Sequence, residues 1–275
     1  TLCKTLPAGG VIARYGVGHD NIDKREATKH RILCTNTPGV LHDSVAEYTV
    51  GLILAAGRHI PAQHQRIVAG GWTPVQGIEL KGKTVAVIGA GRIGTAVARI
   101  LKHGFGCTVV VMETDEAKRK QLERESFVDR VAGPFEEAVD RADFVSLHIP
   151  GSVENHHFVD ARRIAAIKPS AWLINTARGN VVDEVALHGA LSAGKIAGAA
   201  LDVFEKEPYE PISPEHDLRK LNNVLMLPHS ASNTLQACNA MANSVLENIR
   251  LAAGAQYDQM DIINPKVLKS FSRDK

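Results

Sequence analysis

The stretch VAVIGAGRIG, residues 85–94, decides the fold of this chain. The unbroken apolar run over residues 84–88 predicts a strand buried on both faces of a parallel sheet. It leads directly into three spaced glycines, and the apolar residues that follow recur at helical spacing. A strand, a glycine-rich turn and a helix in this order predict a dinucleotide-binding unit with the pyrophosphate at the amino end of the helix.

Each glycine of this turn has its own predicted task. Gly89 allows the tight turn, Gly91 lets the backbone approach the pyrophosphate, and Gly94 lets the helix pack closely on the strand. A second apolar strand, residues 108–112, ends in Glu113, about 20 residues beyond the last glycine. A carboxylate there binds the ribose hydroxyls and repels a 2′-phosphate, so the sequence predicts NAD as the cofactor in preference to NADP.

Composition sets the general bounds. The chain has 275 residues, 44% of them hydrophobic, and a formal net charge of +2, which does not indicate nucleic-acid binding. The longest apolar candidate, residues 45–56, is too short to span a membrane and includes Glu47. Four scattered cysteines form no CxxC pair, which predicts reduced thiols and a cytoplasmic protein.

Strands and helices alternate from residue 83 onward, which predicts an α/β fold with a doubly wound parallel sheet. Further strands are predicted over residues 144–149, 171–176, 196–201 and 224–227. Ser44 and Glu47 have capping-box spacing and predict a long helix to about residue 59. Another long helix is predicted over residues 234–253.

Three polar islands follow the glycine turn in the sequence. They are NTARG at residues 175–179, DVFEKEP at residues 202–208 and LPHSAS at residues 227–232. They supply an arginine, a carboxylate and a histidine, the charge types that a hydride-transfer site needs. In this order, on one α/β pattern, they predict an oxidoreductase.

The chain resembles the D-isomer-specific 2-hydroxyacid dehydrogenases, with the phosphoglycerate dehydrogenase-like branch nearest. The resemblance is carried, in order, by the segments GVGHDNID, NTPGVLHDSVAEYTVGLILAAGR, ELKGKTVAVIGAGRIGTAVA, LHIP, INTARGNVVDEVAL, GAALDVFEKEP and LPH. It implies a Rossmann-type NAD-binding domain over residues 43–231 and a smaller, flavodoxin-like substrate domain from residues 1–42 and 232–275. It also implies a small 2-hydroxy or 2-keto acid as the substrate, and a homodimer.

The resemblance also implies roles for single residues. Arg178 would bind the substrate carboxylate and carbonyl oxygen, and His229 would be the acid/base. Glu207 would pair with His229 and fix its tautomer. Backbone N–H groups at Val17 and Gly18 would bind the substrate carboxylate. On the cofactor side, the resemblance implies contacts from Gly89, Gly91, Arg92, Ile93, Gly94, Glu113, His148, Pro150, Thr176, Ala177, Asp202 and His229.

Several features depart from the family pattern. Gly151, Ser152 and Ala231 replace residues that are usual after the LHIP and LPH motifs, so we expect different packing on the adenosine side and a narrower substrate pocket. The family also has further residues before the strand that matches residues 11–15. We therefore expect a substrate domain that is incomplete at its start, with an uncovered sheet edge.

Two other functions stay open on the sequence alone. An NAD(H)-sensing corepressor-like binding protein would keep the same three islands, and a phosphite dehydrogenase would share the scaffold. A formate dehydrogenase is disfavoured, because its histidine usually has a glutamine partner where this chain has Glu207. We predict no metal site, because the adjacent His156 and His157 have no Cys, Asp or Glu at ligand spacing nearby in the sequence.

Overall fold

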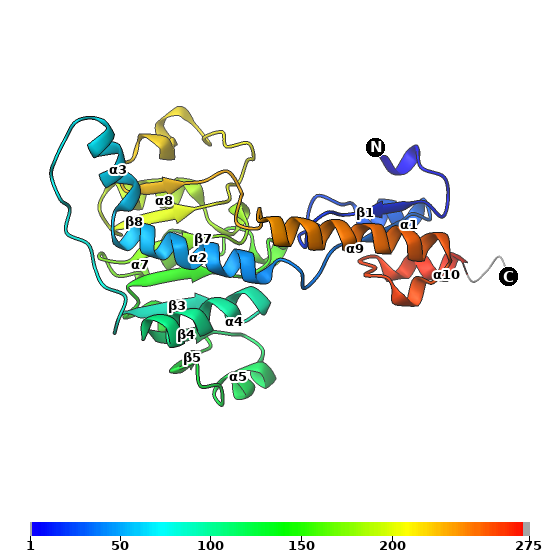
Figure 1. The fold of residues 1–275 in the computed structure, drawn as a ribbon, viewed down its shortest axis with the longest axis horizontal. Helices are drawn as coiled ribbons and strands as arrows, with labels where there is room; N and C mark the ends of the chain where they lie inside the picture. The colour runs from blue at the N-terminus through cyan, green and yellow to red at the C-terminus, as the bar shows by residue number, and fades with distance from the viewer. Residues whose placement is uncertain (1, 272–275) are drawn as a thin grey trace. The chain divides into compact units, whose positions relative to one another are not determined.

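A computed structural model describes residues 2–271 (Figure 1). The chain divides into two compact units. The larger unit is Val45–Ala231, and the smaller unit combines Thr1–Ser44 with Ser232–Lys275.

The larger unit contains a seven-stranded parallel sheet with the order β5-β4-β3-β6-β7-β8-β9. Its strands are β3 (Thr84–Ile88), β4 (Thr108–Met112), β5 (Arg130–Ala132), β6 (Phe144–Leu147), β7 (Trp172–Asn175), β8 (Gly198–Leu201) and β9 (Val224–Met226). The chain proceeds outward from β3 to β5 and then returns to β6 beside β3. This reversal is the topological switch point, where doubly wound sheets bind their ligands at the carboxyl ends of the strands.

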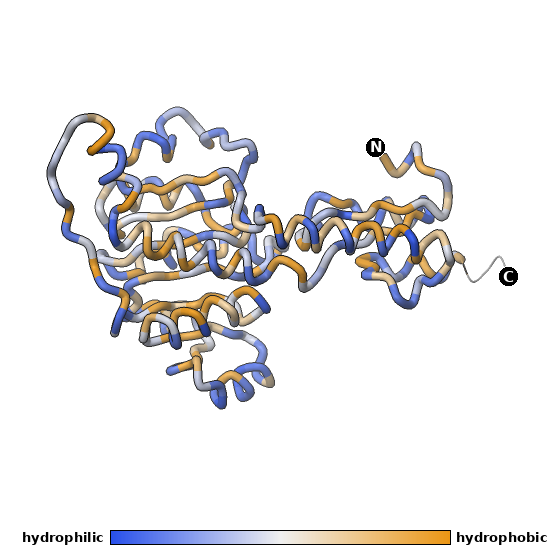
Figure 2. Tube along the Cα trace, in the orientation of Figure 1, coloured by the Kyte–Doolittle hydropathy of each residue, from blue (hydrophilic) through white to orange (hydrophobic). Residues whose placement is uncertain are grey.

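Helices cover both faces of this sheet. They are α2 (His42–Gly57), whose first turn belongs to the smaller unit, α4 (Arg92–Arg99), α5 (Glu116–Leu122), α6 (Phe135–Val139), α7 (Ala161–Ala166) and α8 (Glu184–Ser192). A further helix, α3 (Ile60–Val68), has no buried residue. Val85 and Val87 of β3 pack in one core cluster with residues of α2, α4 and α5. Ala86 and Ile88 pack in another with residues of α6, α7 and α8. Both faces of β3 are therefore buried, as the apolar run predicts, and Figure 2 shows orange along the strands.

The smaller unit has two parallel strands, β1 (Val11–Ala13) and β2 (Leu33–Thr35). Its helices are α1 (Lys24–Lys29), α9 (Leu235–Ala253) and α10 (Leu268–Phe271). Leu33, Leu251 and Val267 form one of its apolar clusters. The buried Asn264 accepts the Cys34 N–H at 2.9 Å and donates to the Ile32 carbonyl at 2.9 Å, so it ties the end of the chain to β2.

The α/β class and the doubly wound parallel sheet are confirmed. Every strand predicted in the larger unit is present, but β5, α3 and α6 were missed because they are short or lie in segments with few apolar signals. The capping box at Ser44 was wrong. The helix α2 begins at His42, and the Ser44 hydroxyl lies 2.7 Å from the Thr234 hydroxyl instead of capping.

Two predictions made from composition concern the cysteines and a membrane span. All four cysteines are free thiols, and Cys3, Cys34 and Cys107 are buried. A cytoplasmic location stays a prediction. Between residues 2 and 271, no helix combines the length and apolar character needed to cross a bilayer.

The glycine turn provides a paired stability test. A Cβ at Gly94 would lie 2.1 Å from the Gly89 carbonyl oxygen, whereas a Cβ at Gly91 would meet no protein atom within 4 Å. We expect Gly94→Ala to lower the free energy of unfolding by about 1–3 kcal/mol through overpacking. Gly91→Ala should leave it nearly unchanged. Urea unfolding of both variants measures this difference, and equal losses would contradict the packing role of Gly94.

Candidate active site

In the glycine turn, the backbone at the amino end of α4 is not covered by side chains. Gly89 has φ +101°, and a Cβ there would lie 2.8 Å from the His148 carbonyl oxygen. Gly91 is the N-cap of α4, so the N–H groups of Arg92 and Ile93 belong to the first turn of the helix. Because no protein atom lies within 4 Å of a Cβ built on Gly91, a phosphate group fits against this backbone.

Glu113 directly follows the end of β4, the strand next to β3. Its Oε1 accepts the Thr114 N–H at 2.8 Å and the Asp115 N–H at 3.1 Å. The carboxylate is therefore held in position by its own turn. This is the place where a dinucleotide-binding fold puts the acid for the ribose hydroxyls.

The loop after β6 lies beside the glycine turn. His148 Nε2 is 2.9 Å from the Ser146 hydroxyl, and burial lowers the pKa of His148 to about 4, so the ring is neutral at physiological pH. Pro150 is exposed. A Cβ at Gly151 would lie 2.8 Å from Cγ of Arg178. Glycine at position 151, which departs from the family pattern, thus leaves room for the Arg178 side chain next to it.

Arg178 lies on the loop after β7, and Asn175 shapes that loop. The buried Asn175 side chain donates to the Arg178 carbonyl at 2.9 Å and accepts the Ala177 N–H at 3.0 Å. Arg178 Nη1 donates to the Ala177 carbonyl at 2.6 Å. The Thr176 hydroxyl is 2.8 Å from the Thr49 hydroxyl of α2, which holds the start of the loop.

Gly179 lets the arginine loop touch the carboxylate loop directly. A Cβ on Gly179 would lie 1.8 Å from the Phe204 carbonyl carbon and 2.4 Å from the Glu205 nitrogen. Only glycine allows this approach, because any side chain would separate the two loops. The NTARG and DVFEKEP islands are therefore packed backbone against backbone.

Asp202 joins the end of β8 to the segment after β9. It is fully buried, and its two oxygens accept the Ser230 N–H at 2.9 Å and the Ala231 N–H at 2.8 Å. His229 lies just before this pair and has φ +53°, in the left-handed region. Asp202 thus fixes the turn that presents His229, which the sequence alone did not indicate. Its predicted contact with the cofactor stays a prediction.

His229 and Glu207 form the central pair of the site. His229 Nδ1 is 2.7 Å from Glu207 Oε2, while Glu207 Oε1 accepts the Phe204 N–H at 3.0 Å. Both side chains are about half exposed. The carboxylate keeps the proton on Nδ1, so Nε2 is the ring nitrogen that can exchange a proton with a reactant.

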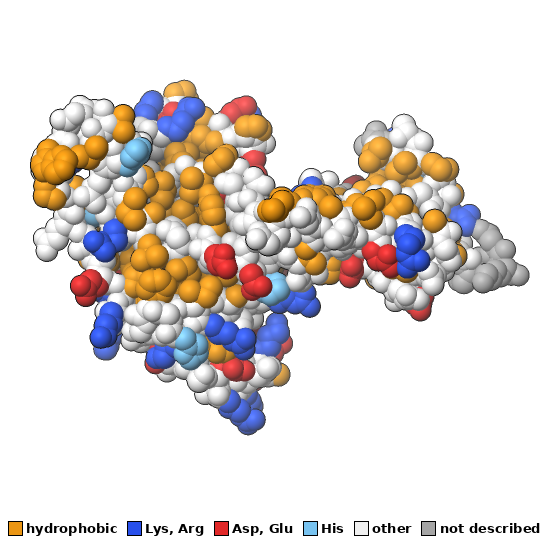
Figure 3. All heavy atoms as spheres, viewed as in Figure 1, with side chains coloured by type: hydrophobic (Ala, Val, Ile, Leu, Met, Phe, Trp, Pro, Cys, Tyr) orange, Lys and Arg blue, Asp and Glu red, His pale blue; other side chains and the backbone are white. Residues whose placement is uncertain are grey.

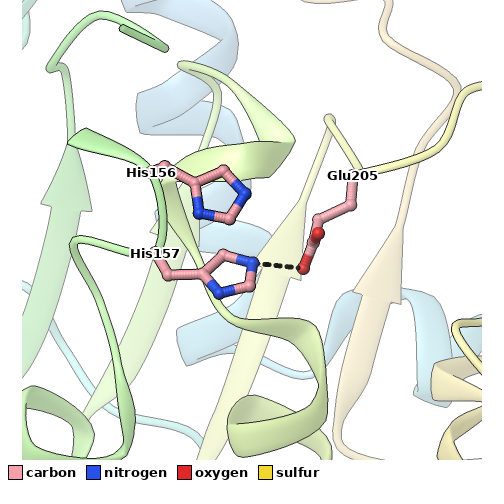
Figure 4. A group of neighbouring side chains, drawn as sticks. All are labelled: His156, His157 and Glu205. Atoms are coloured by element: carbon pink, nitrogen blue, oxygen red, sulfur yellow. Dashed lines mark hydrogen bonds and ion pairs between the residues drawn. The ribbon is translucent and has the colours of Figure 1, made fainter. Parts of the chain in front are cut away.

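A second histidine and carboxylate group lies nearby (Figure 4). The ligand atoms of His156, His157 and Glu205 lie within 4.8 Å of one another, and His157 Nε2 is 3.0 Å from Glu205 Oε1. The sequence analysis did not identify Glu205 as a neighbour of this histidine pair, because it lies 48 residues away in the chain. The absence of a metal site stays a prediction. The two imidazole rings stack with their centroids 3.9 Å apart and their planes tilted by 27°.

Glu184, at the start of α8, connects to this group. It is 4% exposed, and its Oε1 accepts the Glu205 N–H at 2.7 Å. Its own N–H donates to Glu205 Oε1 at 3.3 Å. Burial is the main cause that raises the pKa of Glu184, to about 7, and the nearby Glu205 and Glu207 carboxylates add to it.

The substrate-binding residues predicted at the start of the chain belong to the smaller unit. The Val17 carbonyl accepts from the Asn36 side chain at 2.8 Å, and the Gly18 carbonyl accepts from Arg14 Nε at 3.0 Å. Side chains therefore hold this turn in shape. Its role in binding a carboxylate stays a prediction.

These features define a dinucleotide-binding α/β protein with a histidine–carboxylate pair at the carboxyl edge of its sheet. The family model described as "D-isomer specific 2-hydroxyacid dehydrogenase, NAD binding domain" matches residues 50–231. A glyoxylate reductase of Korarchaeum cryptofilum is 40% identical over 272 residues, which cover 97% of this chain and 79% of that protein.

Solved structures agree with this match. One is the NADPH-dependent glyoxylate/hydroxypyruvate reductase of Sinorhizobium meliloti in complex with NADP and malonate. It superimposes with a TM-score of 0.77 at 35% sequence identity, and the match covers 88% of this chain and 74% of that chain. The D-lactate dehydrogenase of Aquifex aeolicus, complexed with NAD and lactic acid, has a TM-score of 0.81 at 28% sequence identity. That match covers 93% of this chain and 80% of the dehydrogenase chain.

The chain belongs to the D-isomer specific 2-hydroxyacid dehydrogenase family. It is an oxidoreductase that transfers a hydride between a nicotinamide cofactor and a 2-hydroxy or 2-keto acid. The relatives do not favour the corepressor-like binding protein or the phosphite dehydrogenase.

The raised pKa of Glu184 makes folding stability depend on pH. Between about pH 4.3, the ordinary value for glutamate, and the folded-state value of about 7, the folded protein keeps a proton that the unfolded chain has released. The free energy of unfolding should therefore fall as pH rises through this window. Glu184→Gln cannot ionise and should remove up to about 3 kcal/mol of this decline. Urea unfolding from about pH 4 to about pH 8 measures it, and parallel curves for the two proteins would contradict the assignment.

Proposed function

We propose that the protein is an NAD-dependent reductase of small 2-keto acids of the glyoxylate class. The observation that carries this proposal is the 2.7 Å contact between His229 Nδ1 and Glu207 Oε2, next to the loop that carries Arg178. The glyoxylate reductase relatives support the substrate class.

The proposed residue roles follow from charge and geometry. The Arg178 guanidinium binds the substrate carboxylate, because its planar fork matches the two carboxylate oxygens. His229 Nε2 donates a proton to the ketone oxygen in reduction and removes it from the hydroxyl in oxidation. Glu207 holds the imidazole in the required tautomer. When bound, the nicotinamide cofactor supplies or accepts the hydride.

The preference for NAD over NADP rests on Glu113. Two backbone N–H groups hold its carboxylate beyond β4. A 2′-phosphate near this fixed negative charge would be repelled, whereas ribose hydroxyls can donate hydrogen bonds to it. In the same proposal, the larger unit is the NAD-binding domain and the smaller unit is the substrate domain.

A direct assay tests the activity. The purified protein is mixed with NADH and, separately, glyoxylate, hydroxypyruvate or pyruvate at neutral pH, and the loss of NADH absorbance is followed. We expect turnover with glyoxylate or hydroxypyruvate, and a kcat/KM for NADH at least about tenfold above that for NADPH, a difference of about 1.4 kcal/mol. Absence of turnover with all three acids would refute the proposal, and equal use of NADPH would refute the role of Glu113.

Changing His229 to Ala tests the acid/base assignment. Because this change removes the proton donor, we expect kcat to fall by about 10²–10⁴ with NADH binding kept. The matched control is His30→Ala, since His30 Nε2 also lies 3.0 Å from a glutamate oxygen, that of Glu26, but at the carboxyl end of α1 in the smaller unit. The control should keep kcat. An unchanged rate in the His229 variant would remove this residue from the mechanism.

We also propose a homodimer in which a second copy covers α3 and the segment after it. This helix has no buried side chain, and Figure 3 shows an orange cluster over the segment that follows it. Its large exposed apolar residues are Ile60, Ile67 and Val68, followed by Trp72 at 87% exposure. An isolated helix of this length is not stable in water, and a contiguous apolar surface marks an interface.

The oligomeric state can be measured by light scattering after gel filtration. We expect the unchanged protein to be a dimer and the double variant Val68→Ser, Trp72→Ser to shift toward monomer. Val153→Ser removes an equally exposed apolar side chain, 89% exposed, on another segment and should stay dimeric. A monomeric unchanged protein, or a dimeric double variant, would overturn this interface.

A further inference from the structure

Glu184 and Glu205 are joined by two reciprocal hydrogen bonds. The Glu184 carboxylate accepts the Glu205 N–H at 2.7 Å, and the Glu205 carboxylate accepts the Glu184 N–H at 3.3 Å. One bond fixes the backbone of the DVFEKEP loop, and the other uses an N–H of the first turn of α8, which has no partner within its own helix. The loop is therefore anchored to the amino end of α8.

This anchor lies two residues from Glu207. One residue before the anchor, the Phe204 N–H donates to Glu207 Oε1 at 3.0 Å, which leaves Oε2 to meet His229. The loop starts at Asp202, which is itself tied to the backbone of Ser230 and Ala231. Glu184 thus supplies the anchor on the other side of Phe204, the residue whose N–H orients Glu207.

The anchor also places three carboxylates close together. Glu205 and Glu207 both act electrostatically on Glu184, and Glu184 acts on the Tyr209 hydroxyl. His157 Nε2 lies 3.0 Å from Glu205 Oε1, and its Nδ1 is 3.9 Å from Asp183. Burying a carboxylate among like charges is costly, so its hydrogen bonds to the loop must compensate.

We propose that Glu184 is a positioning residue of the reaction: through the Glu205 backbone it sets the loop so that Glu207 stays aligned on His229. The proposal rests on the proposed roles of Glu207 and His229. Glu184 itself touches neither of them through a hydrogen bond. Losing the anchor would let the loop move, and a displacement of about 1 Å at a catalytic pair can reduce the rate about 10²-fold.

The test compares two changes at Glu184. Glu184→Ala removes the acceptor for the Glu205 N–H, and we expect kcat with NADH and glyoxylate to fall about 10- to 100-fold while the Kd for NADH is kept. We also expect the pH profile of kcat/KM to shift, because Glu207 no longer holds His229 at a fixed distance. Glu184→Gln keeps an acceptor oxygen and should retain kcat within about threefold.

The matched control is Asp143→Ala. Asp143 Oδ2 accepts the Thr84 N–H at 2.8 Å, so it also ties two segments through a backbone N–H, but at the amino ends of β3 and β6. This variant should lose comparable stability in urea unfolding and keep both kcat and the pH profile. If it loses kcat as Glu184→Ala does, the effect is one of stability and the proposal is overturned.

A double-mutant cycle with Glu207→Gln shows whether Glu184 acts through Glu207. If it does, adding Glu184→Ala to Glu207→Gln lowers kcat by less than about threefold further, whereas independent effects would multiply. Should Glu184→Ala fail to fold, His157→Asn takes its place in the cycle, because His157 is partly exposed and holds the Glu205 side chain.

The outcomes separate the two proposals. Full activity in Glu207→Gln and His229→Ala would overturn the proposed function. A large loss in those two variants, with an unchanged Glu184→Ala or multiplicative effects in the cycle, would overturn only the positioning role.

Discussion

The site depends on the parallel pairing of β7, β8 and β9. Parallel strands present their carboxyl ends at one edge of a sheet, so the loops after these three neighbouring strands meet there. Each loop carries one of the three predicted site residues, Arg178, Glu207 and His229. Their order along the chain becomes proximity in space because β8 lies between the other two strands.

Within this edge, two buried carboxylates fix the backbone. Asp202 holds the turn after His229, and Glu184 holds the loop before Glu207. Gly179 then allows the arginine loop to touch the carboxylate loop. Hydrogen bonds from backbone N–H groups to carboxylates are strong and directional, so they suit a site in which two half-exposed side chains must keep a 2.7 Å contact.

The sheet and the cofactor class could be predicted from the sequence. The apolar run before Gly89, the glycine spacing and the acid at Glu113 predicted the sheet and the cofactor class, because each reflects local backbone geometry or burial. The short β5 and α6 were missed because a few residues carry too little periodic signal. The Ser44 capping box was wrong because the hydroxyl contacts Thr234, a residue distant in sequence.

The sequence by itself determined the fold class, the dinucleotide turn and the residue types of the site, since strand burial, positive-φ glycines and charge are properties of short segments. Only the tertiary structure decided the partners. It brought Glu205 to His157 and Glu184, and Asp202 to the turn after His229, across long sequence separations. Such contacts depend on which strands are neighbours and on how closely two loops approach, and no local pattern encodes either.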